Sequence, residues 1–126
     1  MKTDACALLY NLEGTPRGRK VKFILIRLGI RIKNVSKEDY LQTIGFLTGS
    51  SQDTRSDAVY EGVGFSEEML VMKGFTQRQL DDFLMYFRKE KIPKIHLKAV
   101  VTPTNQSWNS LQLYEEIKKE HEQMGG

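Results

Sequence analysis

The chain alternates short apolar runs with segments whose apolar residues recur at helical spacing, and this order occurs twice. The first half contains an apolar run at 6–12, a helical pattern from Pro16, a second apolar run at 30–35 and a helical pattern over 40–47. A comparable series begins at Met69, and its two helices are expected to start at a capping box of Thr76 and Gln79 and at the N-cap residue Ser107. Apolar runs bounded by turn residues indicate buried strands, whereas i, i+3, i+4, i+7 spacing indicates a helix face. The alternation predicts an α/β fold.

The first helix has a distinct start and a distinct apolar face. Thr15 is a favoured N-cap residue, and Pro16 suits the first helical position. The apolar residues of the helix form a stripe along one face, which consists of Val21, Ile24, Leu25 and Leu28. Phe23 and Ile26 widen this stripe, so we expect other parts of the chain to cover the helix around much of its circumference.

The two halves also agree in detail. Ile30–Val35 and Ile95–Val100 share the pattern I-x-[IL]-K-x-V, and Leu8-Leu9 matches Leu70-Val71. We interpret this agreement as an internal duplication of a βαβα unit.

We expect a single domain over 1–126, with one repeat at 5–47, a flexible polar link at 48–66 and a second repeat at 69–122. Each repeat would leave one face of its strands uncovered, so the two should share one sheet and one core. The sheet should be mainly parallel, because helix crossovers join parallel strands. A ferredoxin-like α+β sandwich is the alternative.

Charge is distributed unevenly along the chain. Residues 14–37 contain eight basic side chains and no acidic one, whereas residues 38–72 contain seven acidic side chains against Arg55 alone. The net charge is only +3. The basic segment is either a surface for an anionic partner or a helix neutralised by the acidic stretch in the fold. A nucleic acid is the less favoured partner, because no common nucleic-acid-binding motif is present.

Several classes of function lack their usual residues. The chain has one cysteine, Cys6, and two histidines, and neither histidine stands in a metal-binding spacing. Cys6 opens an apolar strand and should be a buried hydrophobe. We therefore predict no metal, no cofactor and no catalytic residue. Residues 1–4 lack the start of a secretory signal, and no apolar run is long enough to span a membrane, so a cytoplasmic location without membrane contact is expected.

Two groups of residues could bind a small anion. The turn at 13–20 lies between a strand and a helix, where backbone donors favour anions, and it contributes Thr15, Arg17 and Arg19. Ligands also collect outside the carboxyl ends of parallel strands. The loops expected there contribute Lys73, Thr102, Thr104, Asn105 and Trp108, with Trp108 beside a cleft and Lys73 or Arg17 within reach.

The second half resembles a small bacterial family that is described only as a domain of unknown function. The resemblance covers about residues 69–122 and rests on Met72-Lys73-Gly74-Phe75, Gln79-Leu80-Asp81, Lys91-Ile92-Pro93 and the run from Leu97 to Asn105. It implies a small bacterial protein and supplies no activity, cofactor, partner or catalytic residue.

The leading hypothesis is a non-catalytic binding or regulatory module of unknown ligand, with a homodimer as one expected assembly. The first alternative is an enzyme or binder that acts on a phosphorylated small molecule through the turn at 13–20. The second alternative is a nucleic-acid-associated protein that uses the basic segment 17–37.

Overall fold

The computed structural model describes residues 4–50 and 53–124. Two of the segments interpreted above lie partly outside the described residues. They are the N-terminal segment expected to lack a secretory signal, which loses Met1 to Thr3, and the expected link, which loses Ser51 and Gln52. The elements follow one another as β1 (Cys6–Tyr10), α1 (Pro16–Arg27), β2 (Arg31–Asn34), η1 (Lys37–Asp39), α2 (Ile44–Leu47), β3 (Met69–Lys73), α3 (Gln77–Lys89), β4 (Leu97–Val100), η2 (Asn105–Ser107) and α4 (Ser110–Gln123).

The four strands form one sheet in the order β2-β1-β3-β4. β1 pairs with β2 in parallel, and β3 pairs with β4 in parallel, as the helix crossovers predict. The central pair β1 and β3 is antiparallel, with Cys6 opposite Lys73 and Tyr10 opposite Met69. The sheet is therefore mixed. The carboxyl ends of β1 and β2 lie at one end of it, and those of β3 and β4 lie at the other.

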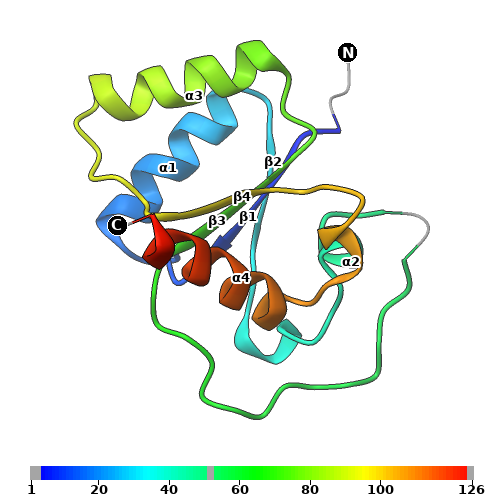
Figure 1. Ribbon diagram of the computed structural model, residues 1–126. Coiled ribbons are helices and arrows are strands. Elements are labelled where there is room, and N and C mark those ends of the chain that lie inside the picture. Colours follow the sequence, from blue (N-terminus) through cyan, green and yellow to red (C-terminus); the bar gives the residue numbers. More distant parts are fainter. Residues whose placement is uncertain (1–3, 51–52, 125–126) are drawn as a thin grey trace.

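Helices cover both faces of the sheet (Figure 1). Alternate residues of β1 point to opposite faces, so Leu9 packs with α1 and α3, while Leu8 and Tyr10 pack with α2 and α4. This arrangement explains why the first strand is apolar throughout: all five of its residues are buried. The expectation of a single shared core was wrong, because the sheet separates two clusters. A ferredoxin-like sandwich is also excluded, because its helices would lie on one face.

The middle of β1 and the middle of β3 meet at the centre of the sheet. Leu8 and Val71, the middle residues of β1 and β3, pair with each other. Thr43 and Asn109, the N-caps of α2 and α4, form an isolated antiparallel bridge. The two halves are therefore joined at the middle of the sheet and at the starts of α2 and α4. An origin of this arrangement in sequence duplication stays a prediction.

Two helices differ from the sequence pattern. The helix expected over 40–47 is reduced to α2, because Thr43 caps a new helix start by accepting a hydrogen bond from the Phe46 amide. The last helix is capped by Asn109 rather than by Ser107, and Asn109 forms a capping box with Gln112. In both places the helix begins at an N-cap residue that lies within the expected helix. The spacing of apolar residues does not show which polar residue is the N-cap.

No helix among the described residues has both the length and the apolar character needed to cross a bilayer.

The connection between the halves is largely exposed, but several contacts anchor it to the first half. Residues 54–59 are exposed. The buried side chain of Gln42 donates to the Ser56 carbonyl and accepts from the Ser56 amide, both at 2.8 Å. Arg55 beside it pairs with Asp39 and keeps 59 % of its side chain exposed.

The flexibility of this connection is tested by limited proteolysis. We expect trypsin to cut after Arg55 before it cuts at other sites, because this backbone lies in neither a helix nor a strand. Time-resolved mass spectrometry of the fragments identifies the first cut. Resistance at Arg55, with cleavage beginning elsewhere, would show that the contacts of Gln42 and Asp39 hold the connection in place.

Candidate functional site

The basic helix α1 buries one side and exposes the other. Its buried side consists of Val21, Ile24 and Leu25 together with Gly18. Phe23 and Ile26 are 73 % and 58 % exposed, so the expectation that they widen the buried stripe was wrong. They lie on the outer side because the sheet covers only one face of the helix, and 3.6 residues per turn carry both positions away from it.

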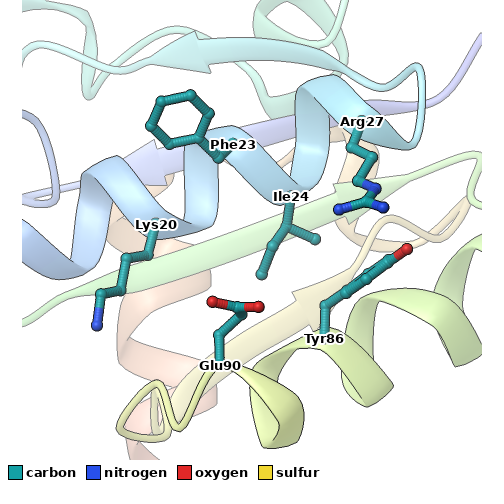
Figure 2. A pocket seen from close by; sticks show the side chains of 6 residues that line it. All are labelled: Lys20, Phe23, Ile24, Arg27, Tyr86 and Glu90. Carbon is teal, nitrogen blue, oxygen red and sulfur yellow. The ribbon is translucent and has the colours of Figure 1, made fainter.

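A groove separates α1 from α3 on this outer layer (Figure 2). Its cavity has a volume of about 310 Å³. Tyr86 and Glu90 border it from α3, a helix whose start is secured by the predicted capping box of Thr76 and Gln79. The α1 side consists of Lys20, Phe23, Ile24 and Arg27. We call these six residues the α1–α3 groove.

The groove combines cations with apolar and aromatic surface. The Arg27 guanidinium lies 5.0 Å from the centre of the Tyr86 ring, which holds the cation over an aromatic face. Glu90 is the acidic side chain of the lining. α1 itself contains no acidic residue, so its exposed positions Arg19, Lys20, Lys22 and Arg27 surround Phe23 and Ile26 with positive charge.

The acidic stretch 38–72 does not neutralise most of this charge. Among the described residues, its ion pairs run from Glu68 to Arg17, from Asp39 to Arg55 and from Glu67 to Lys118. Within that same part of the chain, the four exposed cations of α1 form no ion pair. Of the two interpretations of the basic segment, the structure therefore favours a surface that remains charged.

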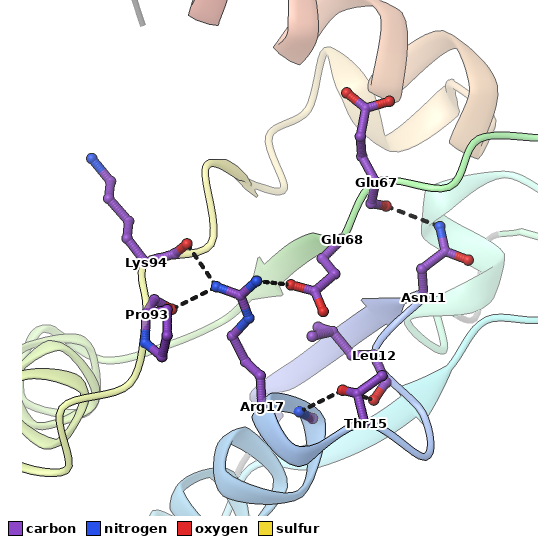
Figure 3. Close-up of polar contacts among 9 residues, drawn as sticks. Asn11, Leu12, Thr15, Arg17, Glu67, Glu68, Pro93 and Lys94 are labelled. Carbon is purple, nitrogen blue, oxygen red and sulfur yellow. Dashed lines mark hydrogen bonds and ion pairs between the residues drawn. The ribbon is translucent and has the colours of Figure 1, made fainter.

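Arg17 is a structural clamp (Figure 3). Its guanidinium donates to the carbonyl oxygens of Pro93 and Lys94, at 2.8 and 2.9 Å, and pairs with the Glu68 carboxylate. These contacts join the start of α1 to the loop before β4 and to the segment before β3. Thr15 is also occupied: it donates to the Leu12 carbonyl and accepts from the Gly18 amide. Arg19 borders one cavity, and Arg17 borders a different one, which it shares with Glu68 and His96.

The second predicted group lies at the other end of the sheet. Lys73 ends β3, and Thr102 begins the loop after β4. The Thr102 hydroxyl accepts from the Asn105 amide, and the Asn105 side chain accepts from the Thr102 amide, so each satisfies the other's backbone. Thr104 is exposed, and Trp108 is half-buried against the cluster that includes α4.

The structure does not bring the two predicted groups together. Thr15, Arg17 and Arg19 follow β1, whose carboxyl end lies beside the amino end of β3. Lys73 and the loop 102–108 follow strands that run the opposite way. Ligand sites gather at the carboxyl ends of strands only when the strands run in one direction. The antiparallel pairing of β1 with β3 therefore divides the expected site, and Arg17 is not beside Trp108.

Cys6 is buried, and the described part of the chain contains no metal-binding cluster. Cys6 is 2 % exposed, and burial raises the pKa of its thiol, which disfavours the reactive thiolate. No group of three or more described His, Cys, Asp and Glu side chains is arranged to hold a metal ion. His96 and His121 do meet, with ring centres 5.4 Å apart, a proximity that no sequence spacing indicated.

The comparisons with known proteins give one match. Residues 68–124 match the model of a family described as a domain of unknown function (DUF3783). The match begins just before β3 and covers the second half of the sheet with α3 and α4, as the sequence resemblance indicated. Neither the curated proteins nor the solved structures gave a match.

Proposed function

We propose that this protein is a non-catalytic binding module that docks an acidic segment of a partner protein on the α1–α3 groove. The observation that carries the proposal is the exposure of Phe23 and Ile26 among cations that no acidic side chain of the described chain pairs with. Exposed apolar residues gathered at one place are typical of interaction surfaces. The expected cytoplasmic location is part of this proposal.

The charge of the groove selects its occupant. A partner segment with Asp or Glu beside Lys20 and Arg27 gains favourable pairing and faster encounter. An apolar side chain of the same segment can enter the cavity over Ile24, beside Phe23 and Tyr86. Buried aromatic and aliphatic anchors inside a charged rim are the usual source of binding energy at such interfaces.

Other occupants fit less well. A symmetric homodimer through this face would bring two cationic faces of α1 together, which costs energy through like-charge repulsion. A nucleic acid needs cations that follow a phosphate backbone. The basic residues of the segment 17–37 are instead divided, because Arg17 clamps loops, Arg31 donates to the Thr48 carbonyl and Lys37 borders a different cavity.

Selection from a random peptide library on the purified protein tests the proposal. We expect the selected peptides to be rich in Asp and Glu with spaced aliphatic or aromatic residues. Their affinity, measured by fluorescence anisotropy, should fall at least tenfold in the Lys20→Glu/Arg27→Glu variant, and a similar loss is expected in Phe23→Ser. All three side chains are exposed, so the fold should be retained.

The matched control is Arg78→Glu/Lys119→Glu, which changes the net charge equally at exposed positions outside the groove. Its affinity should stay within twofold of the wild type. Equal losses in the two double variants would show that net charge alone drives binding and would contradict the proposal. Preferential binding of single-stranded DNA or of anionic lipid vesicles, unaffected by Phe23→Ser, would replace it with one of those partners.

A further inference from the structure

Two adjoining cavities lie at the carboxyl ends of β1 and β2, on the side of α1 away from the α1–α3 groove. Their volumes are about 540 and 110 Å³. Three residues, Leu9, Glu13 and Asn34, line both cavities, so the two are adjacent chambers of one candidate site. Its size lies within the roughly 300–1,000 Å³ of small-molecule sites. Parallel strands end here, which is where α/β sheets receive ligands.

The smaller chamber presents two cations from α1. Arg19 and Lys22 stand one helical turn apart and both border it. Among the described residues neither belongs to an ion pair, and the Arg19 guanidinium makes one long contact, 3.5 Å, to the Gly14 carbonyl. Two adjacent cations without a carboxylate partner favour a compact dianion.

Side chains rather than the helix start supply this positive charge. Pro16 has no amide hydrogen, and the Gly18 amide is already bonded to Thr15. The sequence pattern predicted that backbone donors of the turn at 13–20 would bind an anion. The turn instead differs from a loop that binds phosphate through its backbone amides. Arg19 is the residue of that prediction that borders the chamber.

The larger chamber is polar without being strongly cationic. Asn34 and Ser36 supply an amide and a hydroxyl, Lys37 supplies one cation, and the Glu13 carboxylate stands where the two chambers join. Glu13 accepts hydrogen bonds from hydroxyl groups and repels a second anion at that point. A ligand that fits both chambers has one dianionic group and a neutral body rich in hydroxyl groups.

We infer that this two-chambered site binds a phosphorylated polyhydroxy small molecule, of the sugar phosphate class. The phosphate occupies the small chamber between Arg19 and Lys22, and the hydroxylated body lies against Glu13, Asn34 and Ser36. The inference is independent of the α1–α3 groove, because the two sites use opposite edges of α1 and share no lining residue.

Isothermal titration calorimetry with glucose 6-phosphate as the probe tests the inference on the full chain. We expect saturable binding that weakens at least tenfold in Arg19→Ala/Lys22→Ala and at least fivefold in Ser36→Ala. Glucose and inorganic phosphate should each bind at least tenfold more weakly than glucose 6-phosphate. The reason is that each of them fills only one of the two chambers.

The control is Lys20→Ala/Arg27→Ala, which removes the same charge from the other edge of α1 and should change the affinity by less than twofold. All four side chains are exposed, so both variants should fold, and circular dichroism checks this. Absence of saturable binding, or an equal loss in both double variants, would overturn the inference. Equal affinities for inorganic phosphate and glucose 6-phosphate would overturn the role of the larger chamber.

Discussion

Replacing Gly18 by alanine should destabilise the protein by at least about 2 kcal/mol, although the residue lies inside a helix. A Cβ atom at this position would overlap the Leu12 carbonyl oxygen and lie 2.7 Å from its carbon. The same oxygen accepts from the Thr15 hydroxyl at 2.7 Å. The turn before α1 would have to move, and the N-cap that starts the helix would be weakened. Urea denaturation of wild type and variant measures the change in the free energy of unfolding.

The direction of this effect is opposite to helix propensity, by which alanine is favoured over glycine by about 1 kcal/mol. Gly45→Ala, in α2, is the matched control. Its added Cβ would meet the side chains of Asp53 and Gln106, which can shift, so the loss should be smaller than at Gly18. A Gly18→Ala protein as stable as the wild type would show that the Leu12 turn yields easily.

Replacing Tyr10 by alanine should cost about 4 kcal/mol, the typical loss for a large buried aromatic side chain. Tyr10 is fully buried in β1, and its ring contacts those of Tyr40 and Phe65, each with centres 5.8 Å apart. Its hydroxyl forms a 2.6 Å hydrogen bond with the buried Ser110 hydroxyl, which ties β1 to α4. Chemical denaturation followed by circular dichroism measures the loss.

Tyr10→Phe separates the ring from the hydroxyl. It leaves Ser110 without this partner and should cost about 1–3 kcal/mol. The double variant Tyr10→Phe/Ser110→Ala should lose less than the sum of its single changes, since it removes both members of the pair. Strict additivity of the two single losses would contradict a coupled hydrogen bond.

The same hydroxyl predicts a dependence on alkaline pH. Burial raises the pKa of Tyr10, so it stays protonated in the folded protein where an unfolded tyrosine, with a pKa of about 10, has ionised. The contribution of the protonated Tyr10 hydroxyl to the free energy of unfolding is complete below about pH 10. Above pH 10 this contribution declines by about 1.4 kcal/mol for each pH unit. The stability difference between wild type and Tyr10→Phe should therefore shrink as pH rises from 10 toward 12. A constant difference would contradict the assignment to Tyr10.

Features that depend on near neighbours could be predicted from the sequence. The apolar run of β1, the Thr15-Pro16 start of α1 and the Thr76–Gln79 capping box all appear as expected. A cap satisfies backbone groups within one turn, and a strand buried on both faces must be apolar at every position. Such signals require no knowledge of where the rest of the chain lies.

The division of the candidate site depended on the pairing of distant strands. Two parallel strand pairs can join with either relative direction, and no local pattern distinguishes the two. The antiparallel register of Leu8 with Val71 sends the loop at 102–108 to the end opposite Arg17. The alternative that placed Arg17 within reach of Trp108 was wrong for this reason, whereas the alternative with Lys73, which ends the strand parallel to β4, stays a prediction.

The roles of single side chains on α1 also depended on tertiary contacts. Arg17 and Arg19 are equivalent in charge and both lie in the first turn, yet Arg17 is held by Glu68 and the carbonyls of Pro93 and Lys94, whereas Arg19 borders an open chamber. Phe23 has the hydrophobicity of a core residue but is 73 % exposed where it borders the α1–α3 groove. Spacing along a helix shows which residues share a face, and only the packing of the sheet and α3 shows which face is buried.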